Sequence, residues 1–394
     1  MFEKEKIYIA GPECFYKGGP DILNAMRRRA ESLGFGVTLP NEHPLDMGNP
    51  DLQKRADSIF EDLKMIMKET TVIIADLEAY RGSEADSGTI YEIGMAYADG
   101  IKCYGYTRDK RPLAWKDQKY VMKEGVVYDE NGKKAPYKEL PFSPAVVGST
   151  KIVEGDFDDC LAMLMTDLEE EWKAEGRTGG MAAARDGKAS GAANEAQGWA
   201  NEVQGRANEA QGWINETHDP ADAPAKPRVY LSDVIRYEED AKEVYGRLKE
   251  LCASYGLEAV TPCDWAEGFP ETKGFNPYVR AAALTENYCR LVRSCDAVIA
   301  DLSDYRGYEC SNDVGFECGM GFEMGKKLFG YMKDARPCIE KIPHLGEVAE
   351  FRDMTGSNVE NFNYPANLMF GSSMKIYEGS FEQVIERVAK ELNG

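Results

Sequence analysis

Histidine and long apolar runs are scarce in this sequence, and each scarcity excludes a class of protein. The three histidines are His43, His218 and His344, and none of the ten cysteines forms a C-x-x-C pair. A zinc site needs several such ligands at close spacing, so we expect no metal centre. No apolar run reaches the ~18 residues of a membrane-spanning helix, which excludes such a helix.

Positive charge is also in short supply, with 47 Lys and Arg against 68 Asp and Glu and a net charge of −21. A surface that binds phosphates needs an excess of Lys and Arg, so neither nucleic acid nor a membrane surface is expected as a partner. The opening MFEKEKIYIAGP lacks the apolar stretch of a secretory signal. Scattered, unpaired cysteines are typical of a reducing compartment, and we expect a cytoplasmic protein.

The chain contains an internal repeat. IIADLEAYRGSEADSGTIYEIGMAYADGIKCYGY aligns without a gap with VIADLSDYRGYECSNDVGFECGMGFEMGKKLFGY. KIYIAGPECF upstream matches RVYLSDVIRY, and STKIVEGDFDDCLAML downstream matches SMKIYEGSFEQVIERV. Three collinear matches predict a tandem duplication. The matched pairs include Asp76 with Asp301, Arg81 with Arg306, and Glu92 with Glu317.

The material between the copies differs in composition from both of them. It is rich in Ala, Gly, Asn, Glu and Gln, and from Ala193 it carries the repeat ANEAQGW, ANEVQGR, ANEAQGW. Each repeat holds a Gly, which costs about 1 kcal/mol in a helix interior. We expect a tether with transient helix that lets the copies face each other. The predicted division is a first domain at 1–173, a linker at 174–226 and a second domain at 227–394.

Strand and helix patterns alternate within each copy. In the first copy the apolar strands IYIA, VTL, VIIAD and KCYGY alternate with the helical segments ILNAMRRRAESLG, ADSIFEDLKMIMKET and TIYEIGMAYADG. This alternation predicts an α/β fold, with a doubly wound parallel sheet of the Rossmann or flavodoxin kind in each domain. Two such domains would form a pseudo-dimer. Ligands bind at the carboxyl ends of such strands, so the following loops are the expected site walls.

Glu92 is the first candidate for chemistry. It lies in the second turn of a predicted helix that begins at Asp86-Ser87-Gly88-Thr89, among apolar neighbours. In isolation, Asp86 would be an N-cap and Glu92 an acid favoured by the helix dipole. Two features favour a function instead. Glu92 recurs as Glu317, and its helix begins at the carboxyl edge of the sheet.

The series Y-I-A-G-P-x-x-F, followed by A-D-L-x-x-Y-R-G-x-E-x-D-S-G-T-x-x-E-x-G-x-A, resembles the nucleoside 2-deoxyribosyltransferase family. The likeness covers residues 6–172 and, more loosely, 227–394. It implies a glycosyltransferase of nucleotide salvage that exchanges the nucleobase of a 2'-deoxynucleoside without a metal or organic cofactor. Deoxynucleosides and nucleobases are the implied small-molecule partners. Related deoxynucleotide N-glycosidases share the motif skeleton.

The resemblance also implies roles for individual residues. Glu92 would be the nucleophile, Tyr8 would orient its carboxylate, and Asp62 would donate a proton to the base. Asp86 would contact the sugar hydroxyls and the base. The other expected substrate contacts are Gly11, Phe15, Ser87 and Gly88, with Phe15 stacking near the base. The chemistry agrees, because attack at an anomeric carbon needs a carboxylate on one face and an acid on the leaving group.

The two copies are not equivalent. Family members work as dimers in which a neighbour supplies an Asn from the motif P-x-N-L-M, and the second copy carries it as Asn367, where the first has Ser143. The second copy has in turn lost Gly11-Pro12 and the Asp86–Thr89 series, and Asp62 aligns near Tyr288. We expect one working site per chain, with Asn367 completing the first pocket and the second copy serving as scaffold and lid. Relatives form hexamers from dimers, so a higher homo-oligomer is a further expectation.

Three other functions are compatible with these patterns. The first is an N-glycosidase that passes the sugar to water, and the missing Arg and Ser cluster for a phosphate favours the transferase over it. The second is a nucleotide-binding protein without chemistry, which the intact motifs of the first copy disfavour. The third is an interaction protein joined through the seven-residue repeat.

Overall fold

A computed structural model describes most of the chain: residues 2, 4–116, 121–124, 126–128, 137, 139–174, 226–266, 276–346 and 351–394. The expected linker at 174–226, with its seven-residue repeats, lies outside the described residues except for its two end residues. Within the described part, no helix is both long and apolar enough to cross a membrane.

The first copy folds around a five-stranded parallel sheet with the order β2-β1-β3-β4-β7. This is the flavodoxin-like order, in which the first strand lies inside the sheet. Side chains alternate along each strand, so Ile7 and Ile9 of β1 face one side and Tyr8 and Ala10 the other. The strands are β1 (Lys6–Ala10), β2 (Gly36–Thr38), β3 (Val72–Asp76), β4 (Lys102–Thr107) and β7 (Lys151–Glu154).

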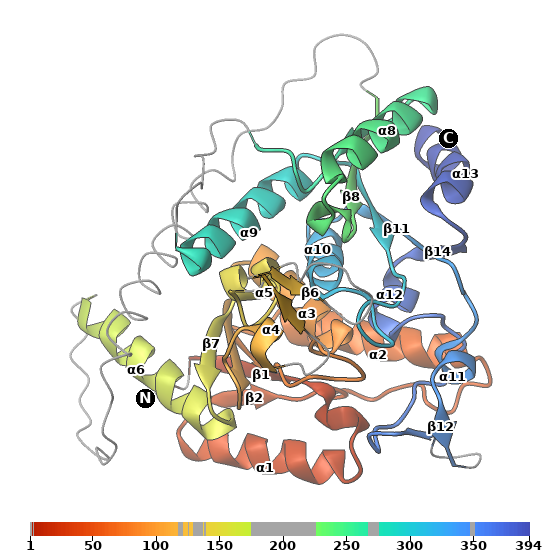
Figure 1. The fold of residues 1–394 in the computed structure, drawn as a ribbon. Helices are drawn as coiled ribbons and strands as arrows, with labels where there is room; N and C mark the ends of the chain where they lie inside the picture. The colour runs from red at the N-terminus through yellow and green to blue at the C-terminus, as the bar shows by residue number, and fades with distance from the viewer. Residues whose placement is uncertain are drawn as a thin grey trace.

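Helices cover both faces of this sheet (Figure 1). Apolar side chains of α1 and α6 pack on the face of Ile7 and Ile9, and those of α2 and α3 pack on the face of Tyr8. The helices are η1 (Pro12–Phe15), α1 (Gly19–Ser32), α2 (Leu52–Met67), α3 (Ser87–Ala98), α4 (Leu113–Lys116), α5 (Pro144–Ser149) and α6 (Phe157–Ala174). A hairpin of β5 (Val121–Lys123) and β6 (Val126–Tyr128) precedes α5.

The second copy repeats the architecture, with the parallel strand order β9-β8-β10-β11-β14. Its strands are β8 (Arg228–Ser232), β9 (Glu258–Val260), β10 (Ala297–Asp301), β11 (Lys327–Met332) and β14 (Lys375–Glu378). Its helices are η2 (Ile235–Tyr237), α8 (Ala241–Ser254), α9 (Pro277–Arg293), α10 (Asn312–Glu323), α11 (Cys338–Lys341), α12 (Leu368–Ser373) and α13 (Phe381–Asn393). A short hairpin joins β12 (His344–Leu345) to β13 (Arg352–Asp353). The predicted duplication and α/β fold class are confirmed.

The two copies share one core. The inner faces of both sheets, with α2 and α3 of the first copy and α9, α10 and α12 of the second, form a single buried apolar cluster. Helices α1 and α6 close the outer face of the first sheet, and α8 and α13 close that of the second. The expected pseudo-dimer is therefore a layered body whose central layer is built from both copies.

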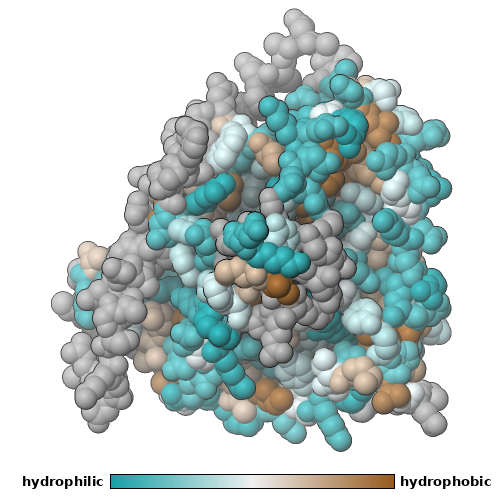
Figure 2. All heavy atoms as spheres, in the orientation of Figure 1, coloured by the Kyte–Doolittle hydropathy of each residue, from teal (hydrophilic) through white to brown (hydrophobic). Residues whose placement is uncertain are grey.

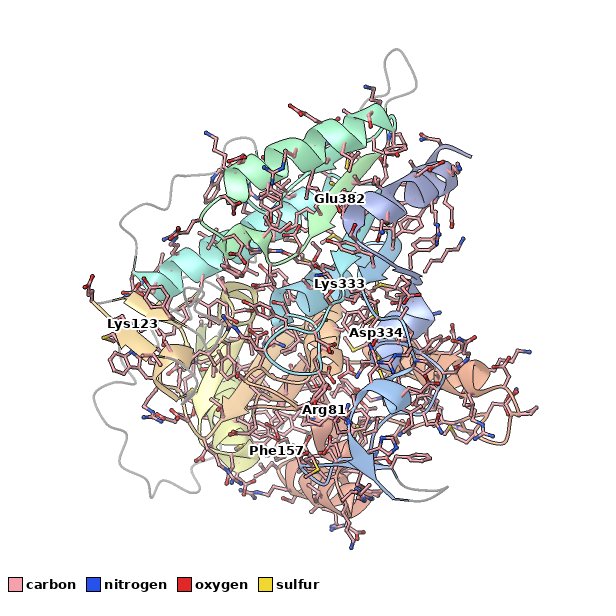
Figure 3. The ribbon with its side chains drawn as sticks, turned by 45° about the vertical axis from the view of Figure 1, so that its right-hand side comes forward. Arg81, Lys123, Phe157, Lys333, Asp334 and Glu382 are labelled. Carbon is pink, nitrogen blue, oxygen red and sulfur yellow. The ribbon has the colours of Figure 1, made fainter. Side chains whose placement is uncertain are left out.

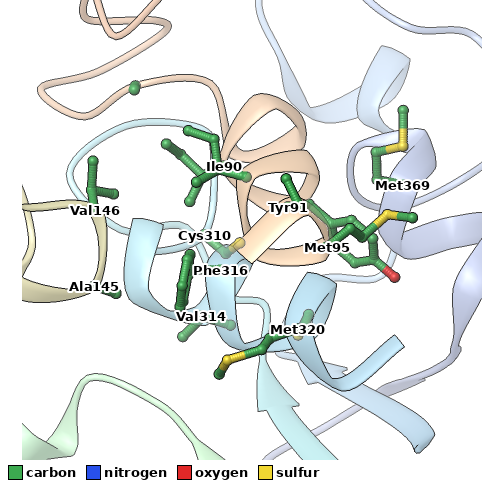
Figure 4. Close-up of a cluster of buried hydrophobic side chains, with 14 of the residues drawn as sticks. Ile90, Tyr91, Met95, Ala145, Val146, Cys310, Val314, Phe316, Met320 and Met369 are labelled. Atoms are coloured by element: carbon green, nitrogen blue, oxygen red, sulfur yellow. The ribbon is translucent and has the colours of Figure 1, made fainter. Parts of the chain in front are cut away.

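Helices α3 and α10 approach each other backbone to backbone at the centre of this layer. A Cβ built on Gly94 would lie 2.1 Å from the carbonyl oxygen of Phe316, and one built on Gly319 would lie 1.9 Å from that of Tyr91. The two contacts are related by the duplication. Around them, side chains of the two helices interdigitate in a buried cluster (Figure 4).

Polar side chains dominate the face of the molecule seen in Figure 2, where apolar groups are scattered. This agrees with the large negative charge of the chain. All ten cysteines are free thiols, and all except Cys14 and Cys263 are buried.

Gly94→Ala and Gly319→Ala are expected to destabilise the protein by about 1–3 kcal/mol, the usual cost of overpacking a tight contact. The added methyl group would meet a backbone carbonyl, which cannot rotate away. The free energy of unfolding from denaturant titration measures the loss.

Gly246→Ala is the matched control. Gly246 lies in α8 with no atom within 4 Å of an added Cβ, so this change should stabilise its helix by about 0.5–1 kcal/mol. Equal stability of the Gly94→Ala variant and the parent protein would contradict the assigned role of the contact.

Candidate active site

Tyr8 and Glu92 meet at the carboxyl edge of the first sheet. Tyr8 lies on the inner face of β1, and Glu92 projects from the second turn of α3. The Tyr8 hydroxyl donates a 2.7 Å hydrogen bond to Oε1 of Glu92, and both side chains are buried. The bond from Tyr8 is the only hydrogen bond that the Glu92 carboxyl makes within the described part of the chain, so Oε2 is not engaged there. One carboxylate oxygen is thus held while the other is available.

Burial sets the protonation of this carboxyl. Loss of water raises the pKa of Glu92 to about 8, the charge of Asp86 adds to the increase, and the hydrogen bond from Tyr8 works against it. Tyr8 also feels the charge of Asp62, and burial raises its own pKa well above the usual value. Tyr8 therefore lies within the electrostatic reach of two carboxyl groups and stays a neutral donor.

Asp86 is the N-cap of α3. Its Oδ2 accepts hydrogen bonds of 2.7 Å from both the amide and the hydroxyl of Thr89. Its Oδ1 is buried and has no partner among the described residues. An unpaired carboxylate oxygen is costly in the interior, so Oδ1 is an acceptor prepared for a ligand donor. Burial also raises the pKa of Asp86.

Asp62 lies on α2 and holds the loop after β2. Its Oδ2 accepts from the amide of Glu42 at 3.0 Å, and its Oδ1 accepts from the amide of His43 at 3.0 Å. The His43 ring nitrogen Nδ1 lies 2.5 Å from the same Oδ1. Asp62 makes no hydrogen bond to Glu92 or Asp86 within the described structure.

Gly11 and Phe15 flank the short helix η1. A Cβ on Gly11 would lie 2.0 Å from Oε2 of Glu13, so a larger residue would displace that carboxyl. The ring of Phe15 is half-buried and stacks on Tyr80, with the ring centroids 5.7 Å apart. Cys14 lies between them in the chain and is exposed. Asp86 and Glu92 lie within electrostatic reach of the Cys14 thiol, so the loop after β1 borders the site.

The second copy contributes Asn367 to this pocket. Its amide Nδ2 would lie 2.6 Å from a Cβ built on Gly88, and Oδ1 accepts from the amide of Met369 at 3.0 Å. The absence of a side chain at Gly88 is what allows this approach. Asn367 therefore lies against the first turn of α3, beside Asp86 and Ser87.

A longer stretch of the second copy also covers the pocket. The amide of Asn358 donates a 2.7 Å hydrogen bond to the carbonyl of Phe15. Arg81 of the first copy donates to Asp353 at 2.8 Å and to the carbonyl of Asn358 at 2.7 Å. Figure 3 shows Arg81 in the interior, where its loop meets the second copy. The segment from β13 to α12 is fixed over the first pocket by these bonds.

Glu360 belongs to this covering segment. It is buried, and its Oε1 accepts from the amide of Leu368 at 3.3 Å. Burial raises its pKa to about 8, Arg81 lowers it, and the charges of Glu309 and Asp86 raise it further. The pocket is therefore lined by carboxyl groups from both copies.

The equivalent pocket of the second copy is filled by its own side chains. Glu317 accepts from Tyr230 at 2.8 Å and from Ser232 at 2.6 Å. Arg236, which aligns with Cys14, donates to both oxygens of Glu317, at 2.6 and 2.8 Å. Both partners are buried, and the guanidinium lies 5.0 Å from the Tyr288 ring centroid. Glu317 has no free oxygen to offer a substrate.

The counterpart of Asp62 is Asn287, which directly precedes the expected Tyr288. Asn287 accepts from the amide of Ala266 at 2.9 Å and donates to the carbonyl of Asp264 at 2.8 Å. It thus holds the loop after β9 as Asp62 holds the loop after β2. This position is next to Tyr288, as the alignment predicts, and the Tyr288 ring contacts Arg236.

Several residues around the site are not predicted by any motif considered above. The exchange of Cys14 for Arg236 was visible in the aligned segments, as was the shared pair of Glu84 and Glu309. Glu360 carries no repeat or motif that could have identified it. Its place depends on how the two copies pack.

The sequence matches a known protein family in each of the two copies. The profile of the family described as Nucleoside 2-deoxyribosyltransferase matches residues 7–137 and 229–369. An uncharacterized protein of Schizosaccharomyces pombe is 31% identical over 118 residues, which is 29% of this chain and 54% of that protein. The chain thus spans about half the length of this curated relative.

A solved structure, a 2-desoxiribosyltransferase from Leishmania mexicana, is 24% identical, with 42% of this chain and 97% of that chain covered and a TM-score of 0.32. The family profile alone covers more than half of the chain and falls on both copies. The chain therefore belongs to the nucleoside 2-deoxyribosyltransferase family.

Proposed function

We propose that this protein transfers the 2-deoxyribosyl group of a 2'-deoxynucleoside to an acceptor nucleobase through a covalent intermediate on Glu92. The observation that carries the proposal is the state of Glu92, which is buried, is held at Oε1 by Tyr8 and has no hydrogen bond at Oε2 from the described residues. A carboxylate fixed in this way can attack a carbon along one direction.

The reaction proceeds in two displacements. Oε2 of Glu92 attacks C1' on the face opposite the base, the N-glycosidic bond breaks, and its electron pair leaves with the base, which takes up a proton. A nitrogen of the second base then attacks C1', the carboxylate leaves, and that base loses a proton. Two inversions give overall retention. Negative charge from Asp86 stabilises the cationic sugar of each transition state.

The proposed substrate contacts follow from the free polar atoms. Oδ1 of Asp86 accepts a hydrogen bond from a sugar hydroxyl, and Nδ2 of Asn367 lies at the same helix turn as a donor. Phe15 stacks near the base, and Gly11, Ser87 and Gly88 shape the walls. The Asp62 and His43 pair, rather than Asp62 alone, is the proposed source of the proton for the leaving base, because the ring nitrogen Nδ1 of His43 lies 2.5 Å from Oδ1 of Asp62.

Base exchange is the direct test of this function. The purified protein, given a deoxynucleoside and a second base, should form the new deoxynucleoside, as followed by liquid chromatography. Glu92→Gln should lower kcat by more than about 10³-fold, the scale of losing a catalytic nucleophile. Glu317→Gln is the matched control and should keep most of the activity, because Glu317 is bound to Arg236.

Two outcomes would contradict the proposal. Free deoxyribose released at the same rate with and without an acceptor base would identify a hydrolase. Equal losses in the Glu92→Gln and Glu317→Gln variants would remove the assignment of one working site per chain.

Asn367→Asp should reduce kcat/KM by about tenfold or more, although Asn367 belongs to the second copy. Asp keeps the oxygen that caps α12, but it lacks the amide donor beside Gly88 and adds charge near Asp86. A lost hydrogen bond of about 1–1.5 kcal/mol accounts for this factor. Ser143→Ala, at the equivalent place in the first copy, is the control. Unchanged kinetics for Asn367→Asp would refute the contribution across the copies.

The pH dependence of kcat/KM should report Glu92 in the free protein. A nucleophile must be ionised, so activity should rise with pH toward the Glu92 pKa of about 8. Tyr8→Phe should shift the acidic limb of this pH profile to higher pH by about one to two units. The hydrogen bond from Tyr8 stabilises the ionised form of Glu92, so its loss raises the Glu92 pKa. An acidic limb near the ordinary glutamate pKa, unmoved by Tyr8→Phe, would contradict the assignment.

The same shift has a consequence for stability that needs no activity. The pKa of Glu92 is higher in the folded protein than in the unfolded chain. The contribution of Glu92 to the free energy of unfolding should therefore decline as the pH rises from its unfolded-chain pKa of 4.5 through about 8. Glu92→Gln should therefore gain thermal stability relative to wild type, and the gain should be larger at pH 9 than at pH 5.

A further inference from the structure

Each copy lends a buried glutamate to the first turn of the central helix of the other copy. Glu309 accepts a hydrogen bond of 3.3 Å from the amide of Ser87, and a second one from the Ser87 hydroxyl, at the start of α3. Glu84 accepts one of 2.8 Å from the amide of Asn312 at the start of α10. Glu84 and Glu309 occupy equivalent places in the duplication, so the exchange is reciprocal.

An arginine of the opposite copy pairs with each glutamate. Nη1 of Arg81 lies 3.4 Å from Oε1 of Glu309, and Nη1 of Arg306 lies 3.3 Å from Oε1 of Glu84. Both arginines adopt a left-handed backbone, with φ of 51° and 57°, directly before a glycine. The two glycines pair across the pseudo-twofold axis in an isolated antiparallel bridge. The glutamates are therefore held by the same turn in both halves.

Glu309 shares the capping of α3 with Asp86. The first amides of a helix lack partners within the helix. Asp86 satisfies the amide of Thr89 with Oδ2, and Glu309 satisfies the amide and hydroxyl of Ser87. This division leaves Oδ1 of Asp86 unpaired. Without Glu309, the two Ser87 donors would lose their acceptor in the same turn where Oδ1 of Asp86 is free.

The two carboxyl groups also influence each other by charge. Burial, and then the negative charge of Asp86, raises the pKa of Glu309 to about 7, while Arg81 and Ser87 lower it. The effect is mutual, so removing the charge of Glu309 lowers the pKa of Asp86. A third carboxyl, Glu360 of the covering segment, interacts with the same pair by charge, and the positive charge of Arg81 lowers the pKa of all three.

We propose that Glu309 is a positioning residue for the Glu92 site, which holds Ser87 and so keeps Oδ1 of Asp86 free for the substrate. The proposal rests on the function proposed above for that site. Glu84 makes the corresponding contacts with α10, but α10 carries Glu317, which Arg236 occupies. Glu84 therefore has no site to position, which makes it a matched control for Glu309.

Glu309→Gln and Glu84→Gln test this assignment in the full chain. Both changes remove a buried charge beside an arginine, so they should lower the unfolding temperature by similar amounts. In the base-exchange assay, Glu309→Gln should reduce kcat/KM at least about fivefold and shift its pH profile, while Glu84→Gln stays within about twofold of wild type. Equal kcat/KM losses in the two variants, or full activity of Glu309→Gln, would overturn the proposal.

A second measurement separates this inference from the function on which it rests. In denaturant unfolding, a double-mutant cycle of Glu309→Gln and Asp86→Asn should show a coupling well outside additivity, because the two side chains share one helix turn. The cycle of Glu84→Gln with Asp86→Asn should be closer to additive. If the wild-type protein exchanges no base, the proposed function fails. If the double-mutant cycle of Glu309→Gln and Asp86→Asn is additive, the proposed coupling between Glu309 and Asp86 is refuted, whatever the activity.

Discussion

The close contact of α3 and α10 is the constraint on which the rest of the molecule depends. These are the helices that carry Glu92 and Glu317, and they touch through Gly94 and Gly319 with no room for a side chain. Their approach brings the first turn of each helix beside the loops of the other copy. Asn367, Glu309 and the segment covering Phe15 reach the first pocket for this reason. A site confined to one copy would lack all of these contacts.

This geometry accounts for the two different features of the second copy. Its own pocket is closed by Arg236, and a bidentate, buried arginine–carboxylate pair of this kind leaves no acceptor for a ligand. Yet its inner face supplies half of the shared core, and its loops complete the first pocket. A domain whose own carboxylate is occupied by an arginine can thus still supply the core and the contacts that its neighbour needs.

Sequence patterns predicted the parts of this protein that depend on local periodicity. Short apolar runs located β1 and β3, and the repeat predicted the second sheet. Tyr8 lies beside Glu92, as the family resemblance implies. Contacts between side chains of the two copies could not be predicted from local sequence patterns. Glu360 lies in a segment without a motif, and the hydrogen bonds by which Asn287 replaces Asp62 depend on the folded loop after β9. Arg236 was visible in the aligned segments, but its two bonds to Glu317 require the folded geometry.

Joining the copies in one chain removes a restriction that a symmetric dimer obeys. In a homodimer each change occurs twice, so replacing Cys14 with an arginine would close both pockets. Here the same position holds Cys14 in one copy and Arg236 in the other, and the closed pocket gains a buried ion pair while the other stays open. The reciprocal glutamates show the remaining symmetry, since Glu84 and Glu309 keep equivalent contacts although one of the two helices has no free carboxylate. The contacts at the shared interface are therefore kept in both copies by packing. The surroundings of the buried glutamate differ, because Arg236 binds Glu317 in the second copy and none of the described arginines binds Glu92 in the first.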